Sequence, residues 1–178
     1  MDQPLVTAAI DERRSPTPAA VHKRDAIRRL KEALAADRFV LHYQPIVDAH
    51  DGRAVSAEAL LRWRDPRQDH DAIAELLESA ERSPVIFNLE NWALDQALRA
   101  ARGWLDAGLS LRVGVNLSAR EFPRADLGGR LRFRLSASGL PPSALALEIT
   151  ESSAVDDFTA AADRLEDLAA TGIELWLD

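Results

Sequence analysis

The stretch Arg53-Ala54-Val55-Ser56-Ala57-Glu58-Ala59-Leu60-Leu61-Arg62-Trp63 decides the fold prediction, because a strand-type alternation here carries both an acid and a base. Side chains alternate across a β-strand, so Glu58, Leu60 and Arg62 share one face and the residues between them share the other. Both faces are too apolar for a sheet with one side in water, which predicts a strand covered on both sides. A buried Glu58 carboxylate needs a partner, either Arg62 in an internal ion pair or a metal ion.

Three further segments share this arrangement, with aliphatic residues on one face and a polar side chain near the C-terminal end. The segments are residues 111–118, 144–151 and 173–178, and their polar residues are Asn116, Glu148 and Asp178. In parallel barrels, active sites are built at the C-terminal ends of the strands. Together with Glu58, these residues offer the oxygen ligands that a hard cation such as Mg²⁺ or Ca²⁺ prefers. The alternative is four unrelated polar groups, each satisfied by the backbone.

The composition is that of an ordinary globular protein. The 178 residues are enough for one domain with a substantial core, and the 47% hydrophobic and 29% charged residues exclude a disordered chain. The absence of cysteine excludes disulfides, zinc–thiolate sites and thiol nucleophiles. The net charge of −7 argues against a nucleic-acid polymer as partner, but it allows a small phosphate ligand where a metal and an arginine offset the acids. No segment resembles a membrane span or a signal peptide, so we expect a cytoplasmic protein with no membrane partner.

The remaining periodicity predicts an α/β fold. Residues 1–24 are expected to be a flexible, proline-containing leader, with the first helix beginning near Val21. Helices are expected at residues 21–36, 71–81, 86–106, 125–138 and 156–170, and strands at residues 39–47, 53–63, 111–118, 144–150 and 173–178. Asp51-Gly52 predicts a tight turn that makes the first two strands antiparallel, and the later β-α order predicts parallel strands. Residues 130–135 alternate like a strand, but a parallel neighbour requires a crossover there, so we predict a helix.

Four short motifs resemble the EAL domain, a family of bacterial phosphodiesterases that open the second messenger cyclic di-GMP to linear pGpG. The motifs are Tyr43-Gln44-Pro45-Ile46-Val47, Glu58-Ala59-Leu60-Leu61-Arg62-Trp63, Val115-Asn116-Leu117-Ser118-Ala119-Arg120 and Leu147-Glu148-Ile149-Thr150-Glu151-Ser152. They occur in the family's order and at similar separations, over a domain of residues 25–178. The resemblance implies a modified TIM-type barrel whose first strand is antiparallel, which agrees with the hairpin predicted above.

The resemblance also implies roles for individual residues. The positions that match the family's ligands for Mg²⁺ or Mn²⁺ are Glu58, Asn116, Glu148 and Asp178, and Glu58 is the implied catalytic residue. Arg62 matches the residue beside the ligand phosphate, and Leu60 and Gln44 match positions that line the nucleotide pocket. For Gln44, a structural hydrogen bond is an equal alternative. Two metals in such a site bridge a phosphate oxygen and turn water into the attacking nucleophile.

The resemblance departs from the family in two places. Residues 67–87 lack the proline-and-phenylalanine motif usual after the second strand. The chain also stops at Asp178, before the family's second aspartate, lysine, glutamate and glutamine. A closed barrel takes about 250 residues, so we expect a partial TIM-type barrel, truncated after about five strands and incomplete at its C-terminus.

Two functions follow from these expectations. The first is a cyclic di-GMP-specific phosphodiesterase, of which this chain is an inactive fragment. The second is a degenerate, non-catalytic EAL module in signalling, which binds cyclic di-GMP or a signalling protein or forms a homodimer. A third alternative is an unrelated α/β protein with coincidental polar strand ends.

Overall fold

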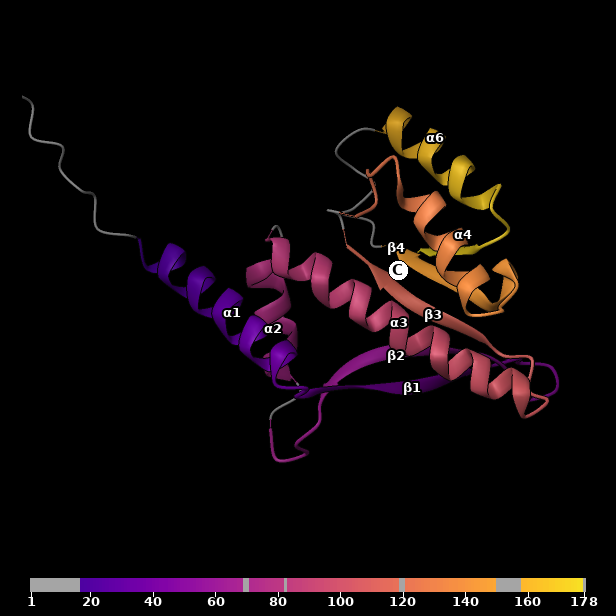
Figure 1. The fold of residues 1–178 in the computed structure, drawn as a ribbon, viewed down its shortest axis with the longest axis horizontal. Helices are drawn as coiled ribbons and strands as arrows, with labels where there is room; N and C mark the ends of the chain where they lie inside the picture. The colour runs from indigo at the N-terminus through magenta and orange to yellow at the C-terminus, as the bar shows by residue number, and fades with distance from the viewer. Residues whose placement is uncertain (1–16, 69–70, 82, 119–120, 150–157, 178) are drawn as a thin grey trace, which may run out of the picture.

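The computed structural model describes residues 17–68, 71–81, 83–118, 121–149 and 158–177 (Figure 1). Its strands are β1 (Phe39–Val47), β2 (Ala54–Trp63), β3 (Arg112–Leu117), β4 (Leu145–Ile149) and β5 (Glu174–Leu177). Its helices are α1 (Pro18–Ala35), α2 (Asp71–Ala80), α3 (Pro84–Asp106), α4 (Leu127–Ala137) and α6 (Phe158–Ala169), with the short 3-10 helix η1 (Pro142–Ala144) before β4. The predicted elements are therefore present, with ends that differ by a few residues.

The strands form a single sheet in the order β1-β2-β3-β4-β5. β1 is antiparallel to β2, and every later pair of neighbours is parallel, so the predicted hairpin and parallel sheet are confirmed. In the hairpin loop Gly52 has a φ of +71°, a left-handed conformation that glycine adopts without steric cost. Pro45 lies in β1, at an edge of the described sheet, where its missing N–H is tolerated.

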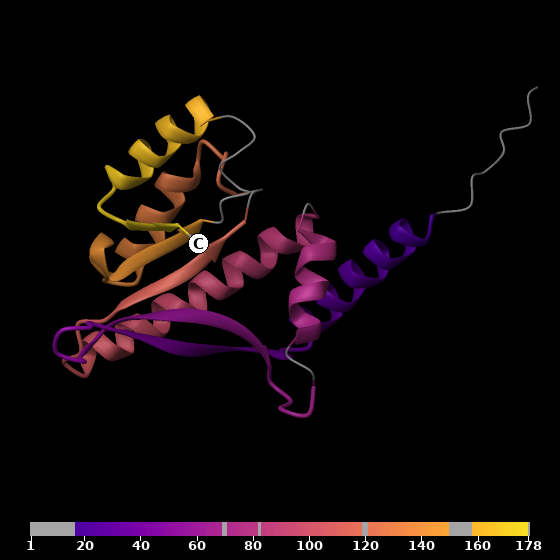
Figure 2. The same cartoon turned by 180° about the vertical axis from the view of Figure 1, so that it is seen from behind.

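Helices α3, α4 and α6 cover one face of the sheet, and Figures 1 and 2 show this layer from opposite sides. The aliphatic residues of this layer include Val113, Val115, Leu117, Leu145, Leu147 and Ile149 from the strands and Leu98, Leu131 and Leu168 from the helices. Helix α4 occupies the segment with ambiguous periodicity, so the crossover predicted there is confirmed. The strand at residues 53–63 was predicted to be covered on both faces. Ala57 and Ala59 on one face are buried, whereas Glu58, Leu60 and Arg62 on the other are half-buried, so the second face is covered only in part.

A second core forms where β1 begins and β2 ends. The rings of Phe39 and Trp63 stack there with their centroids 4.9 Å apart, and helices α1, α2 and the start of α3 pack around them. This cluster places α2 beside the C-terminal end of β2. It thereby positions one wall of the cavity described below.

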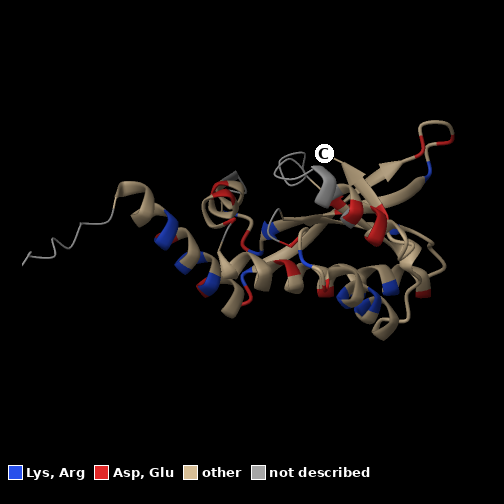
Figure 3. Cartoon of the chain, turned by 90° about the horizontal axis from the view of Figure 1, so that it is seen from above, with Lys and Arg blue, Asp and Glu red and all other residues tan. Residues whose placement is uncertain are grey.

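Helix α1 begins at Pro18, earlier than the predicted Val21 and within the residues expected to be a leader. The Thr17 hydroxyl accepts a hydrogen bond from the Ala20 N–H (3.3 Å), and proline is favoured in the first helical turn. Figure 3 shows the basic residues of α1 at one end of the molecule. Arg28 among them is paired with acidic neighbours within the helix, as on an ordinary solvated surface. None of the described helices has the length and apolar character of a membrane span.

Candidate metal and nucleotide site

Three of the four predicted metal ligands lie on the same face of neighbouring strands. The Asn116 amide Nδ2 donates a hydrogen bond to Glu58 Oε1 at 3.3 Å, which joins β3 to β2. Asn116 is also the direct register partner of Glu148 on β4, so both side chains point to the same face. The fourth predicted ligand, Asp178, lies outside the described residues. The geometry therefore supports convergence of Glu58, Asn116 and Glu148 and leaves Asp178 as a prediction.

The chemistry of these three side chains suits a hard divalent cation. Two carboxylates and one carboxamide provide oxygen donors, and Mg²⁺, Mn²⁺ and Ca²⁺ prefer such donors. Within the described ranges no three His, Cys, Asp or Glu residues gather closely enough to hold a metal by themselves. A cation here therefore depends on the Asn116 oxygen in addition to Glu58 and Glu148. Glu148 is buried, Glu58 is half-buried and Asn116 is exposed, so the site is open on the β3 side.

The internal ion pair between Glu58 and Arg62, one of the two alternatives from the sequence, is contradicted. Arg62 Nη1 instead donates a hydrogen bond to the Leu61 carbonyl at 2.8 Å, and no ion pair joins Arg62 to a described carboxylate. The physical reason is distance along the strand. At about 3.3 Å per residue, side chains four positions apart are separated by about 13 Å, whereas the neighbouring strand lies about 5 Å away. Glu58 therefore meets Asn116 rather than Arg62.

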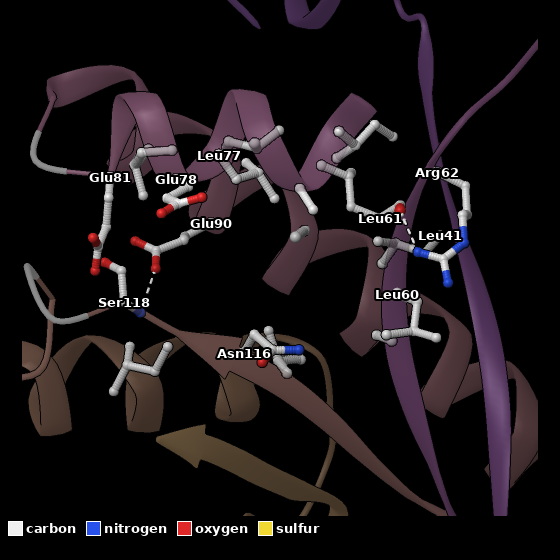
Figure 4. Close-up of a pocket in the computed structure, with 18 residues that line it drawn as sticks. Leu41, Leu60, Leu61, Arg62, Leu77, Glu78, Glu81, Glu90, Asn116 and Ser118 are labelled. Carbon is white, nitrogen blue, oxygen red and sulfur yellow. Dashed lines mark hydrogen bonds between the residues drawn. The ribbon is translucent and has the colours of Figure 1, made fainter. Parts of the chain in front are cut away.

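Leu60 and Arg62 line a cavity of about 560 Å³ at the C-terminal ends of β2 and β3 (Figure 4). The cavity exists because the two strands pair only as far as Ala59 and Val115 and separate beyond them. Helices α2 and α3 cover the gap, so the walls are mostly aliphatic. Asn116 also lines the cavity, so the cavity is next to the predicted metal ligands.

Gln44 is the direct cross-strand partner of Glu58, so it lies on the same face of the sheet as Glu58, Asn116 and Glu148, which we call the ligand face. It is exposed and does not line the cavity. Its side chain forms no hydrogen bond with any described residue, so the structural hydrogen bond considered for it is not observed there. A role in nucleotide binding stays a prediction for Gln44.

Three carboxylates that the sequence did not single out lie at the other end of the cavity. Glu78, Glu81 and Glu90 come from the end of α2, the residue that follows it and the first half of α3, and Figure 4 shows them near Ser118. The 3-residue spacing of Glu78 and Glu81 was a helical signal that they share a side. Nothing in the sequence indicated that Glu90 would join them, because that depends on how α3 crosses β3.

Glu90 anchors the segment that follows Asn116. Its Oε1 accepts a hydrogen bond from the Ser118 backbone N–H at 2.7 Å, and its Oε2 has no hydrogen-bond partner among the described residues. Burial away from water raises the pKa of Glu90 to about 7, and the hydrogen bond from Ser118 offsets only part of that rise. The contact fixes the C-terminal end of β3 against α3 and so limits where Asn116 can lie.

A buried ion pair lies close to this segment, between Glu121 and Arg130 of α4. The Glu121 carboxylate is 2% exposed and accepts a hydrogen bond from Arg130 Nη2 at 2.7 Å. The guanidinium groups of Arg124 and Arg130 also lie over the ring of Phe87, at 5.1 and 4.9 Å from its centroid. These contacts join α4 and the residues before it to α3.

The fold and the site together define a class of protein. Parallel strands with an antiparallel first strand, helices on one face and oxygen-bearing side chains at neighbouring strand ends are features of a partial TIM-type barrel. The EAL domain family matches residues 27–178, and the chain belongs to this family. The family expectation drawn from the four motifs is thereby confirmed.

Proteins similar to this chain include two from Pseudomonas aeruginosa. The bifunctional diguanylate cyclase/cyclic di-GMP phosphodiesterase MucR is 41% identical over 150 residues, which are 84% of this chain and 22% of MucR. The cyclic di-GMP phosphodiesterase NbdA is 37% identical over 150 residues, which are 84% of this chain and 19% of NbdA. The PaMucR phosphodiesterase in its c-di-GMP complex superposes with a TM-score of 0.74 and 38% identity, covering 85% of this chain and 62% of that one. The chain thus spans about a fifth of the length of these curated relatives.

Proposed function

We propose that this chain carries the metal- and phosphate-binding part of a cyclic di-GMP phosphodiesterase site. The observation that carries the proposal is the contact of Glu58 with Asn116 at 3.3 Å, with Glu148 in direct register beside Asn116. Two similar proteins support the proposal, since MucR and NbdA are named as cyclic di-GMP phosphodiesterases and the PaMucR structure holds c-di-GMP. Asp178 completes the proposed ligand set.

The proposed roles follow from position. Mg²⁺ or Mn²⁺ held by these oxygens would neutralise phosphate charge and supply an acidified water for opening the ring. Arg62 would contact a phosphate oxygen in this proposal, since it lines the cavity that Asn116 also lines and its planar guanidinium suits that contact. Leu60 offers an apolar surface to a base. Gln44 would contact a ligand that occupies the open face, since it is the exposed cross-strand partner of Glu58.

Binding without hydrolysis is the second candidate function. Asn116 and Gln44 are exposed, and a phosphodiester held on an open face stays in water. Electrostatic stabilisation of a transition state is strongest where water is excluded. We therefore infer that this chain alone binds the metal and the dinucleotide without producing pGpG. A homodimer or a signalling partner that covers the open face is part of the same proposal.

Calorimetry with Mn²⁺, followed by cyclic di-GMP in the presence of Mn²⁺, tests the proposal on the chain of residues 1–178. Glu58→Gln should weaken Mn²⁺ binding by about tenfold or more, because a neutral amide replaces a charged ligand. Glu166→Gln, an exposed change on α6, is the matched control and should leave the affinity unchanged. Arg62→Ala should weaken dinucleotide binding while Mn²⁺ binding persists. Equal Mn²⁺ affinity in Glu58→Gln and wild type would contradict the proposed site.

Separation of the reaction products by ion exchange decides between the two candidate functions. Intact cyclic di-GMP after incubation with Mn²⁺ is the expected result for this chain. The appearance of pGpG would show that the open face does not prevent turnover and would favour the enzyme.

A further inference from the structure

Gly114 lies in the middle of β3, where neighbouring side chains leave no room for a Cβ atom. Its backbone is not in the left-handed region, so its conformation alone does not require glycine. A Cβ atom built at Gly114 would lie 2.5 Å from Trp176 Cζ3 and 2.8 Å from Glu148 Oε1. Both distances are shorter than any normal van der Waals contact. The indole of Trp176 and the carboxylate of Glu148 therefore meet over the bare backbone of Gly114.

The strand register explains how an indole on β5 reaches β3. Trp176 pairs with Glu148, whereas Gly114 pairs with Ala146, two residues earlier along β4. The ring therefore extends across β4 and ends over Gly114. Gly114 and its register partner Ala146 are both small and buried. A side chain at Gly114 would displace the ring.

A hydrogen bond and an ion pair, linked through Glu174, orient the indole of Trp176. Trp176 Nε1 donates a hydrogen bond to Glu174 Oε1 at 3.0 Å. The other oxygen of Glu174 forms an ion pair with Arg112 Nη2 at 2.7 Å. Because Arg112 is two residues before Gly114 on β3, these two contacts link Trp176 to the same strand as Gly114.

We propose that Gly114 and Trp176 form a matched pair that holds the carboxylate of Glu148 in position, which makes Trp176 a positioning residue for this predicted metal ligand. The proposal rests on the proposed function, in which Glu148 binds a divalent cation. The indole fills the volume beside the carboxylate on the ligand face, so it restricts the rotamers that Glu148 can adopt. Groups that orient a ligand in this way contribute strongly to metal affinity.

A set of variants in the chain of residues 1–178 tests the pair, with the Mn²⁺ dissociation constant measured by calorimetry. Gly114→Ala should weaken Mn²⁺ binding by about tenfold, because the added methyl group displaces both the ring and the carboxylate. The double change Gly114→Ala with Trp176→Leu should recover most of that loss, because the methyl group then occupies part of the space beside the Glu148 carboxylate that Trp176→Leu alone leaves empty. Gly103→Ala is the matched control, since a Cβ there meets nothing within 4 Å.

Wild-type affinity in Gly114→Ala, or a double variant as weak as the single one, would overturn the matched pair while leaving the proposed function standing. Absence of Mn²⁺ binding by the wild type would contradict the proposed function, and the positioning role with it. Circular dichroism establishes that each variant is folded. If Gly114→Ala does not fold, Trp176→Leu alone decides, with weaker Mn²⁺ binding expected and wild-type binding contradicting the role.

Discussion

Replacing Glu90 by glutamine should stabilise the protein at neutral and alkaline pH. Under mildly acidic conditions the gain in stability over the wild type should be much smaller. The pKa of Glu90 is raised from 4.5 to about 7 because its carboxyl is buried. Between these values the folded protein keeps a proton that the unfolded chain has lost. The contribution of Glu90 to the free energy of unfolding therefore falls as the pH rises from about 4.5 to about 7, and it stays low above that range.

The size of the effect follows from the pKa. At about 1.4 kcal/mol per pKa unit, a rise from 4.5 to about 7 corresponds to about 3 kcal/mol of lost stability once the group is ionised in both states. Glutamine carries no such charge, and its amide oxygen can still accept the hydrogen bond from the Ser118 N–H. The stabilisation by Glu90→Gln should therefore grow by about 2 kcal/mol between pH 5 and pH 8.

Urea unfolding of the wild type and the variant at a series of pH values measures this difference directly. Glu78→Gln is the control, because its carboxyl lines the same cavity but is exposed, and it should leave the pH profile unchanged. A stability difference between Glu90→Gln and wild type that stays constant from pH 5 to pH 8 would refute the argument. It would mean that Glu90 is ionised in the folded protein at acidic pH.

Three further predictions concern the supports of the site. Arg130→Met should lower the free energy of unfolding in urea by about 3 kcal/mol, because it leaves the buried Glu121 carboxylate without its closest charge partner; adding Glu121→Gln should recover part of the loss. Leu145→Ala should cost about 3 kcal/mol in the same assay, since this side chain is fully buried in the core. Mn²⁺ should raise the melting temperature of the wild type, EDTA should reverse that rise, and Glu58→Gln should show a smaller rise at the same Mn²⁺ concentration.

The strands and their polar ends were predictable because alternation is a local property. Each segment has a period of two, so the sequence alone assigns Asn116 and Glu148 to the face opposite the aliphatic residues. The register of β3 with β4 then places them side by side, as the structure confirms. The Asp51-Gly52 turn fixed the antiparallel first strand by equally local means.

The cavity and its carboxylates were not predictable, because they depend on packing between elements far apart in the sequence. Helical periodicity identifies the buried side of α2 and α3, but it does not say which strands each helix covers. Glu90 reaches Ser118 only because α3 crosses the end of β3 there. The absence of a side chain at Gly114 likewise has no local cause. It follows from Trp176, which is distant in the sequence and arrives through the register of β4 with β5.

The ligand face and the core are two results of the same register. Val115 and Leu147 are direct partners in the β3–β4 ladder and point into the helix-covered core, which makes Asn116 and Glu148, one residue later, partners on the opposite face. A slip of one residue would turn these polar side chains into the core and the aliphatic ones into water, at a cost of several kcal/mol. Any folded state that keeps the core must therefore present the predicted ligands together. Asn116 and Glu148 lie on the face opposite this core, so we expect substitutions there to weaken metal binding without preventing folding.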